Sequence, residues 1–127
     1  MVSPFAKVQS DALATVRATA GASITYTRGS NSASVVAVPG SSDFSVVSGD
    51  LVAETIKSPD FLINAAELSV AMIAGGESSF TEPLRGDLVV DDDGRTFVVM
   101  PDKSVPAWEY GDRDGRKWFR VHTKRAE

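Results

Sequence analysis

The sequence predicts a mainly β fold, a small antiparallel β-barrel or sandwich with an N-terminal amphipathic α-helix and long flexible loops. Two patterns predict it. Apolar residues at helical spacing occupy the first twenty positions, and short alternating segments follow from there toward the C-terminus. Clusters of Gly, Pro, Ser and Asp separate these segments, as is typical of short strands joined by turns. The length of 127 residues fits a single domain, 1–127.

The first predicted element is a helix over residues 3–20. Ser3 is a suitable N-cap, and Pro4 occupies the first helical position, where its missing N–H costs nothing. Gly21 ends the helix, because glycine enters the left-handed C-cap conformation without a steric penalty. We expect the helix to close one end of the core or, alternatively, to pack its outer face on a neighbouring subunit. Its apolar stripe consists of Phe5, Val8, Ala12, Leu13, Val16 and Ala20.

The predicted barrel covers residues 22–124 and is followed by a short tail, 125–127. A Pro-Gly-Ser-Ser cluster predicts a loop at 39–43, and Ser58-Pro59-Asp60 predicts a bulge or an edge break. The first strands are expected where β-branched and aromatic residues predominate, at 23–28, 33–38, 44–47, 51–57 and 61–63.

A second helix is predicted to begin after Asn64. Asn64 and Glu67 have the spacing of a capping box, in which each side chain satisfies a backbone N–H of the other residue. The apolar run 68–74 is too short for its periodicity to distinguish helix from strand, so both remain open. The polar, glycine-containing stretch that follows predicts a loop at 75–86.

Two pairs of strands are predicted in the last third of the chain. Residues 88–90 and 96–100 form a hairpin around Asp93-Gly94, which supplies the positive-φ turn. Residues 107–110 and 117–123 form the second pair. On the final strand Phe119, Val121 and Thr123 share one face, and Trp118, Arg120, His122 and Lys124 share the other.

Composition argues against most active sites. The chain has no cysteine and one histidine, His122, which argues against disulfide scaffolds, zinc fingers and thiol nucleophiles. The run Asp91-Asp92-Asp93 lacks the alternating ligands of a calcium loop, and a hairpin turn explains it better. We therefore expect no catalytic residues, no cofactor and no metal. The N-terminus has no signal-peptide pattern and no segment is long enough to span a membrane, which indicates a soluble protein made in the cytoplasm.

The net charge of −4 conceals two segments of opposite sign. Residues 77–93 carry six acids and one base, whereas residues 113–125 carry six bases. Either the two segments neutralise each other within one molecule, or the acidic patch of one subunit meets the basic strand of the next. Aromatic residues and arginine are enriched at interfaces. The interface candidates are Trp108, Tyr110, Arg116, Trp118, Arg120, His122 and Lys124, together with Asp91 and Asp92.

The order of motifs resembles the head–tail joining proteins of tailed bacteriophages and prophages, also called head-completion, stopper or tail-attachment proteins. The resemblance runs from the first helix to Lys124, although residues 69–81 form a longer stretch than the pattern leads one to expect. The motifs that carry it are Tyr26-Thr27-Arg28-Gly29, Asp60-Phe61-Leu62-Ile63-Asn64-Ala65-Ala66-Glu67-Leu68, Pro83-Leu84-Arg85-Gly86-Asp87, Trp108-Glu109-Tyr110 and Arg120-Val121-His122-Thr123-Lys124.

This resemblance implies a structural protein of the virion that assembles in the host cytoplasm. It implies a cyclic homo-oligomer, a hexamer or dodecamer, between the portal or its adaptor and the tail terminator or tail tube. Such a ring would retain packaged DNA without sequence-specific binding, dock the tail and make no membrane contact. As a hypothesis, either residues 38–49 or the loop at 75–83 reaches the lumen or a neighbouring ring; the loop residues singled out are Gly75, Gly76, Glu77, Ser78, Ser79 and Phe80.

Two alternatives remain at this stage. A tail terminator, or another neck or tail protein, can share the plan of a barrel with a helix. A small nucleic-acid-binding barrel would use Trp118, Phe119 and the basic final strand to stack bases and contact phosphate, although the acidic net charge argues against it. A small hydrolase is disfavoured because no catalytic constellation is evident.

Overall fold

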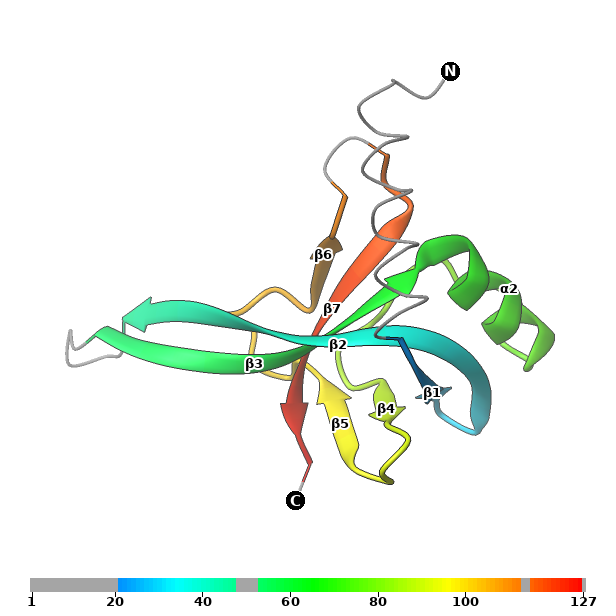
Figure 1. The fold of residues 1–127 in the computed structure, drawn as a ribbon, viewed down its shortest axis with the longest axis horizontal. Coiled ribbons are helices and arrows are strands. Elements are labelled where there is room, and N and C mark those ends of the chain that lie inside the picture. Colours follow the sequence, from blue (N-terminus) through cyan, green and yellow to red (C-terminus); the bar gives the residue numbers. More distant parts are fainter. Residues whose placement is uncertain (1–20, 48–52, 113–114, 127) are drawn as a thin grey trace.

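Within the part of the chain that the structure describes, six antiparallel strands close into a small barrel, and one helix packs beside it (Figure 1). The structure is a computed structural model, and it describes residues 21–47, 53–112 and 115–126. The mainly β prediction is confirmed. The predicted helix at 3–20 lies outside the described residues.

The barrel begins with a meander. Strand β1 (Ala22–Arg28) pairs with β2 (Asn31–Val47), which pairs with β3 (Ala53–Asn64). Strand β1 also pairs with β4 (Leu88–Val90), and β4 forms a hairpin with β5 (Thr96–Val99). Strand β7 (Trp118–Arg125) pairs with both β5 and β3 and thereby closes the barrel, while the short β6 (Trp108–Tyr110) pairs with the first half of β7.

The core follows from the alternation of side chains along the strands. Ile24 and Tyr26 of β1 and Phe119 and Val121 of β7 point inward and are buried. The hairpin between β4 and β5 has the predicted chemistry, with Gly94 at a φ of +83°. The alternation of polar and apolar residues therefore predicts both the strands and the face that each one buries.

The helix α2 (Ala65–Ala74) resolves the ambiguity of the apolar run after Asn64. The Asn64 side chain caps it by accepting a hydrogen bond of 3.1 Å from the backbone N–H of Glu67. Leu68 and Met72 are fully buried against the barrel. Among the described residues, no helix is long and apolar enough to cross a bilayer.

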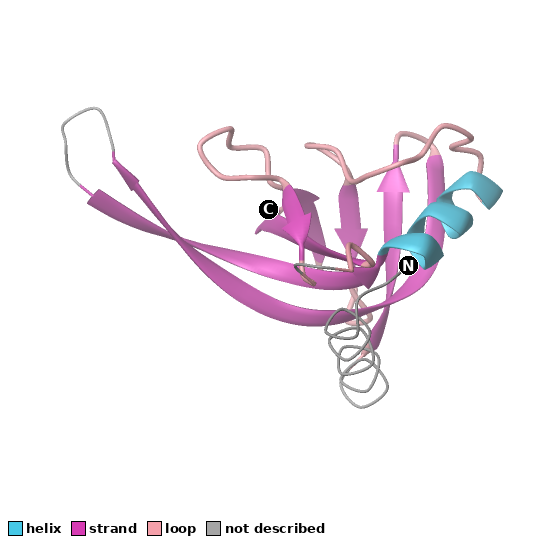
Figure 2. Ribbon diagram, turned by 90° about the horizontal axis from the view of Figure 1, so that it is seen from above, coloured by secondary structure: helices cyan, strands magenta, loops and turns pink. Residues whose placement is uncertain are grey.

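The long hairpin of β2 and β3 extends well beyond the barrel (Figures 1 and 2). Strand β2 pairs with β1 as far as Ala37, and β3 pairs with β7 from Asp60 onward. Residues 40–47 and 53–59, which we call the arm, therefore pair only with each other.

The predicted interruptions at 39–43 and 58–60 are wrong, because both segments lie within the continuous strands β2 and β3. Pro39 lies opposite Phe61 and Pro59 opposite Ser41, where each strand has a ladder on one edge only. A proline tolerates this position because its missing N–H faces the unpaired edge. Residues 75–86 contain neither helix nor strand.

Candidate functional site

Asp87, which directly precedes β4, lies at the centre of a buried charged cluster and accepts its hydrogen bonds. It accepts a hydrogen bond from the Tyr26 hydroxyl, and the Arg28 guanidinium lies 2.8 Å from its Oδ2 atom. The backbone N–H of Leu84 donates to the same oxygen at 3.0 Å. We call Tyr26, Arg28, Leu84 and Asp87 the Asp87 cluster; it joins β1 to the loop that precedes β4.

The Asp87 cluster changes the acidity of its tyrosine. Burial, followed by the hydrogen bond to Asp87 and the negative charge of that carboxylate, raises the pKa of Tyr26 well above its ordinary value. The Tyr26 hydroxyl therefore stays protonated and donates to Asp87 at physiological pH.

Arg85 fixes a neighbouring loop. Its guanidinium donates hydrogen bonds to the backbone carbonyls of Met100, Asp102 and Val105, at 2.8 to 3.0 Å. Gly86 follows at a φ of +91°, which favours glycine because a Cβ would be strained there. The Arg-Gly-Asp motif thus fixes the segment before β4 to the loop at 100–105 through Arg85 and to β1 through Asp87.

His122 is the centre of a second buried cluster, on the outer face of the barrel wall. Its Nδ1 lies 2.8 Å from Asp60 Oδ1, and its Nε2 lies 3.0 Å from Glu109 Oε1. The hydroxyls of Ser42 and Ser58 also donate to Asp60. We call these five residues the His122 cluster; they come from β2, β3, β6 and β7.

Three of the predicted interface residues form one aromatic surface on β6 and the following turn. The Trp108 ring packs edge-on against Tyr110 and Phe119, with centroids 5.0 and 4.9 Å away. The Arg116 guanidinium lies 5.9 Å from the Tyr110 ring, and Tyr110 is 41% exposed. We call Trp108, Tyr110 and Arg116 the aromatic patch; Tyr110 and Arg116 are exposed, whereas Trp108 is half-buried and packs against the core.

Two other predicted interface residues, Trp118 and His122, do not belong to an exposed surface. They are 1% and 0% exposed within the single chain. Asp112 accepts hydrogen bonds from the backbone N–H groups of Lys117 and Trp118, and the Trp118 side chain is buried on the same face of β7 as His122, opposite the core-facing Phe119. Arg120 is half-buried and Lys124 is exposed.

The loop at 75–80 is attached at two points. The Glu77 carboxylate accepts a hydrogen bond of 2.7 Å from the Asn31 side chain. Phe80 is 3% exposed within the single chain, packs edge-on against Tyr26 and lies under the Arg28 guanidinium. Gly75, Gly76, Ser78 and Ser79 are exposed.

The acidic turn is partly neutralised by its own arginine. The Arg95 guanidinium lies 2.7 Å from Asp91 and 3.0 Å from Asp93. Desolvation acts to raise the pKa of Asp91, but the hydrogen bonds from Arg95 outweigh it, and the pKa lies below its ordinary value. The three carboxylates of Asp91, Asp92 and Asp93 lie within 4.8 Å of one another, with Arg95 holding two of them.

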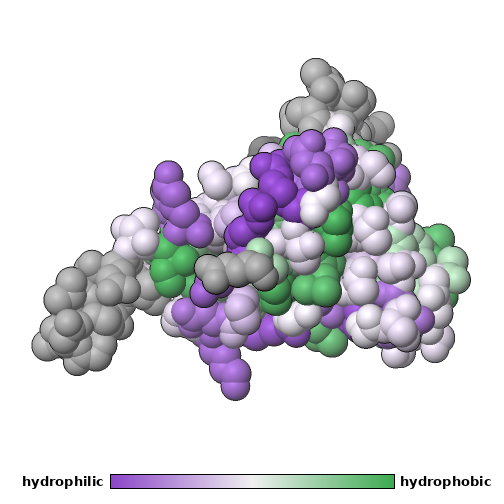
Figure 3. Space-filling model, turned by 90° about the horizontal axis from the view of Figure 1, so that it is seen from below, coloured by the Kyte–Doolittle hydropathy of each residue, from purple (hydrophilic) through white to green (hydrophobic). Residues whose placement is uncertain are grey.

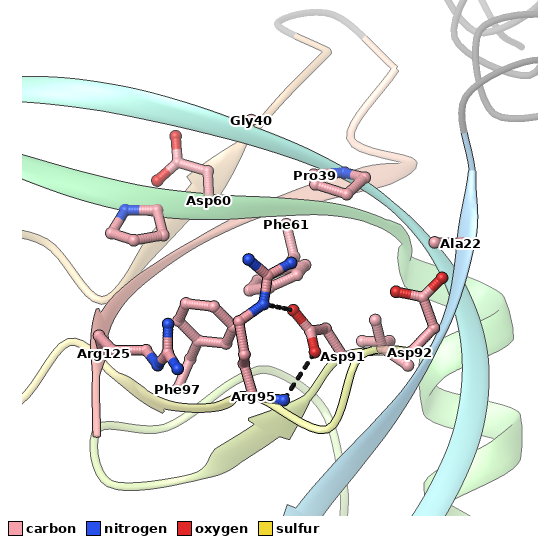
Figure 4. A pocket seen from close by; sticks show the side chains of 12 residues that line it. Ala22, Pro39, Gly40, Asp60, Phe61, Asp91, Asp92, Arg95, Phe97 and Arg125 are labelled. Atoms are coloured by element: carbon pink, nitrogen blue, oxygen red, sulfur yellow. Dashed lines mark hydrogen bonds and ion pairs between the residues drawn. The ribbon is translucent and has the colours of Figure 1, made fainter. Parts of the chain in front are cut away.

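A pocket of about 340 Å³ lies where the arm leaves the barrel, beside the acidic turn (Figure 4). Phe61 and Phe97 contribute apolar walls, and Asp91 and Asp92 face Arg95 and Arg125 across it. Arg125 also lies 5.6 Å from the centre of the Phe97 ring. Arg125 of the basic segment thus lines the same pocket as Asp91 and Asp92, whereas the ion pairs of the acidic turn are with Arg95, outside the basic segment.

The side of α2 that faces away from the core is apolar. Val70 is 69% and Ile73 is 46% exposed, and a shallow groove separates α2 from Ser34 and Val36 of β2. The space-filling view shows hydrophobic areas alternating with hydrophilic ones, and one hydrophobic area lies at the right-hand end, where Figure 1 places α2 (Figure 3).

Sequence reasoning singled out the right segments but did not predict their contacts. The Tyr26–Arg28 and Arg85–Asp87 motifs meet in the Asp87 cluster. The segments containing Asp60, Glu109 and His122 meet in the His122 cluster. The available signal was weak, because Arg28, Asp60 and His122 lie in strands of mixed polar and apolar residues and Asp87 directly precedes β4.

The fold and these surfaces define a small closed β-barrel with a projecting hairpin arm, internal charged clusters and accessible aromatic and apolar areas. Residues 5–127 match the family model described as phage head-tail joining protein. The chain therefore belongs to the phage head-tail joining protein family, a family of structural proteins, and the resemblance predicted from its motifs is confirmed. No curated protein matches the sequence.

Proposed function

We propose that the protein is a head-completion, or stopper, protein that forms a ring in the phage neck. The ring lies between the portal or its adaptor and the tail terminator or tail tube. There it retains the packaged DNA and provides the docking surface for the tail. The observation that carries this proposal is the family match over residues 5–127, which favours a joining protein over a tail terminator or an independent nucleic-acid binder.

The aromatic patch and exposed charges elsewhere on the barrel are the proposed contacts between subunits or with neck partners. Trp108 and Tyr110 combine a large apolar area with polar atoms, as residues at the centre of interfaces commonly do. Arg116 of the patch is exposed, and the exposed Asp92 in the β4–β5 turn and Lys124 near the end of β7 add polar contacts away from the patch. A cyclic ring of six or twelve copies repeats the same head-to-tail contact around its axis.

The loop segment 75–79 or the arm is proposed to reach the lumen or a neighbouring ring. The arm extends away from the barrel, and Ser78 and Ser79 are exposed (Figure 2). A strongly basic lumen would bind phosphates and slow DNA passage, whereas the net charge of this chain is −4. We therefore propose that the chain meets DNA without sequence specificity and performs no catalysis.

Particles made without this protein test the proposal. The gene is removed from the encoding phage or prophage, and lysates are examined by electron microscopy with and without the protein supplied in trans. We expect heads without tails, together with heads that have lost DNA, and restoration by the supplied protein. Normal tailed particles in its absence would reject the joining role.

Paired variants then test the proposed contact surface. Trp108→Ala combined with Tyr110→Ala removes the aromatic patch, and Val70→Ala combined with Ile73→Ala removes a similar exposed apolar area on α2. We expect the first pair to fail in restoring tailed particles while remaining folded, and the second pair to restore them. If instead the Val70/Ile73 pair failed to restore tailed particles and the Trp108/Tyr110 pair restored them, the contact surface would be the apolar face of α2.

A further inference from the structure

The helix α2 is apolar on the side that faces away from the barrel as well as on the side that packs against it. Leu68 and Met72 are fully buried, whereas Val70 is 69% exposed. Glu67 is the one charged residue of this helix. A helix that is apolar all round is normally buried all round, because aliphatic side chains gain free energy by leaving water. The outward side of α2 therefore has the composition of a contact surface.

A groove of about 550 Å³ runs between this side of α2 and β2, and we call it the α2 groove. Ala66, Val70 and Ala74 are spaced four residues apart and form one ridge of α2 along it, and Val36 contributes the β2 side. Helices pack by placing the ridge of one between the ridges of the other. The small side chains on either side of Val70 leave room for a second helix to approach closely, so the shape of the groove suits a helix.

The chain enters the barrel beside the α2 groove. Ala22, the first residue of β1, pairs with Ala37, and Ser23 pairs with Val36. Neighbouring strands lie about 5 Å apart, so the segment that precedes Ala22 is attached about one strand spacing from the β2 side of the groove. Such a tether gives the segment a high effective concentration at this groove, which favours contact within the chain over contact with a second copy.

The sequence of residues 1–20, which lie outside the described residues, matches the groove in character and in length. The helix predicted at 3–20 has an apolar stripe that includes Val8, Ala12 and Val16. Such a helix extends about 25 Å, whereas the ten residues of α2 extend about 15 Å, so it is long enough to cover the groove. The other segments outside the described residues have five residues or fewer.

We propose that residues 5–20 form an amphipathic helix that lies in the α2 groove of its own chain, with the apolar stripe against Val70. In this arrangement the apolar side of α2 is an internal contact, and the aromatic patch remains available to partners. The proposal agrees with the result expected for Val70→Ala combined with Ile73→Ala, because alanine at both positions keeps the groove apolar and the segment bound.

Hydrogen exchange of the full chain, measured by mass spectrometry, tests the contact. We expect the amides of residues 8–20 to exchange about ten times more slowly than those of an unstructured chain. Val70→Asp places a charge in the groove and should remove this protection, and circular dichroism verifies that the barrel stays folded. The matched control Thr55→Asp adds the same charge at an exposed position of the arm and should leave the exchange unchanged.

A second pair of variants lies in the segment itself and tests the same contact if Val70→Asp does not fold. Val16→Asp interrupts the apolar stripe and should remove the protection of residues 8–20. Ala14→Asp introduces the same residue on the opposite side of the predicted helix and should retain the protection. Both variants leave the described barrel unaltered.

Cross-linking determines which chain supplies the segment. The chain has no cysteine, so Val16→Cys combined with Val70→Cys introduces the only two thiols, which a short bismaleimide can join. We expect a cross-link within one chain at every protein concentration, and a much lower yield for Ala14→Cys combined with Val70→Cys. Unprotected amides in residues 8–20, or protection that survives the charge at Val70 or Val16 in a folded variant, would overturn the proposal. Cross-links formed only between chains would also overturn it, because the segment would then occupy the groove of a second copy.

Discussion

At Asp87 one buried carboxylate serves donors from two parts of the chain. Tyr26 and Arg28 come from β1, and the N–H of Leu84 comes from the loop before β4. The side chain of Asp87 is 6% exposed and that of Arg28 is 18% exposed. Removing one member of this cluster leaves buried polar groups without a hydrogen-bond partner. The resulting loss of folding free energy is larger than the net stabilisation that the interaction itself provides.

Asp87→Asn should therefore destabilise the barrel strongly. We expect the free energy of unfolding to fall by about 2 kcal/mol, somewhat below the range for fully buried pairs because Arg28 is partly exposed. The matched control is Asp93→Asn, whose carboxylate is 70% exposed and also contacts an arginine; it should change the free energy by less than about 1 kcal/mol. Urea unfolding measures the free energy of unfolding of both variants. Equal decreases would show that Asp87 contributes no more to stability than the exposed Asp93.

The raised pKa of Tyr26 predicts a loss of stability in alkali. Above the ordinary tyrosine pKa of 10.0 the unfolded chain releases this proton while the folded chain retains it, so rising pH favours unfolding. Tyr26→Phe should flatten this decline by up to about 1.4 kcal/mol per pH unit. Tyr110→Phe, at an exposed tyrosine, should leave the slope unchanged. Urea unfolding at several alkaline pH values measures how the free energy of unfolding decreases with pH. The account would be contradicted if the free energy of Tyr26→Phe decreased as steeply as that of the unmodified chain.

The two charged clusters show which parts of the site the sequence could predict. The motifs around Arg28, Asp87 and His122 stand out through the family resemblance, because Arg28 ends β1, Asp87 directly precedes β4 and His122 lies in a strand of mixed polar and apolar residues. Which residues pair depends on strand register, and Asp60 and His122 are 62 positions apart. Local periodicity carries no information about such a pairing, and it placed His122 on a shared strand face without indicating that the arm and β6 cover it.

Among the elements, α2 can be predicted from a local sequence signal, whereas the strands of the arm depend on pairing between distant residues. The cap at Asn64 was readable because the capping residue and the N–H that it satisfies are three positions apart. Pro39, Pro59 and the serines at the base of the arm resemble turns when each segment is considered alone. Their strand conformation comes from an eleven-pair ladder between β2 and β3, which a local pattern does not reveal.

Asn64→Ala should weaken α2 through the loss of its cap. We expect the free energy of unfolding to fall by about 1 kcal/mol, because the Glu67 N–H loses its acceptor. Asn64→Asp retains an accepting oxygen and should remain close to the unmodified protein. Hydrogen exchange of the first turn of α2 checks the cause: faster exchange is expected in Asn64→Ala alone, and equal exchange in both variants would contradict the capping role.

For the whole molecule, closure through β3 and β7 creates a rigid barrel on which the arm, the aromatic patch and the apolar face of α2 are presented in different directions. The sequence predicted the barrel because its alternation and turns are regular. It did not predict that Asp91 and Arg125 line one pocket, because they come from segments far apart in the chain. Membership of the head-tail joining family assigns such a module to the virion.

The proposed place in the neck is tested most directly by cryo-electron microscopy of intact particles, reconstructed around the junction of head and tail. We predict a ring of copies of this barrel directly below the portal or its adaptor and above the tail tube, with the aromatic patch at a contact between proteins. Its absence from the neck of particles that retain DNA and carry tails, or its presence only elsewhere in the virion, would contradict the account.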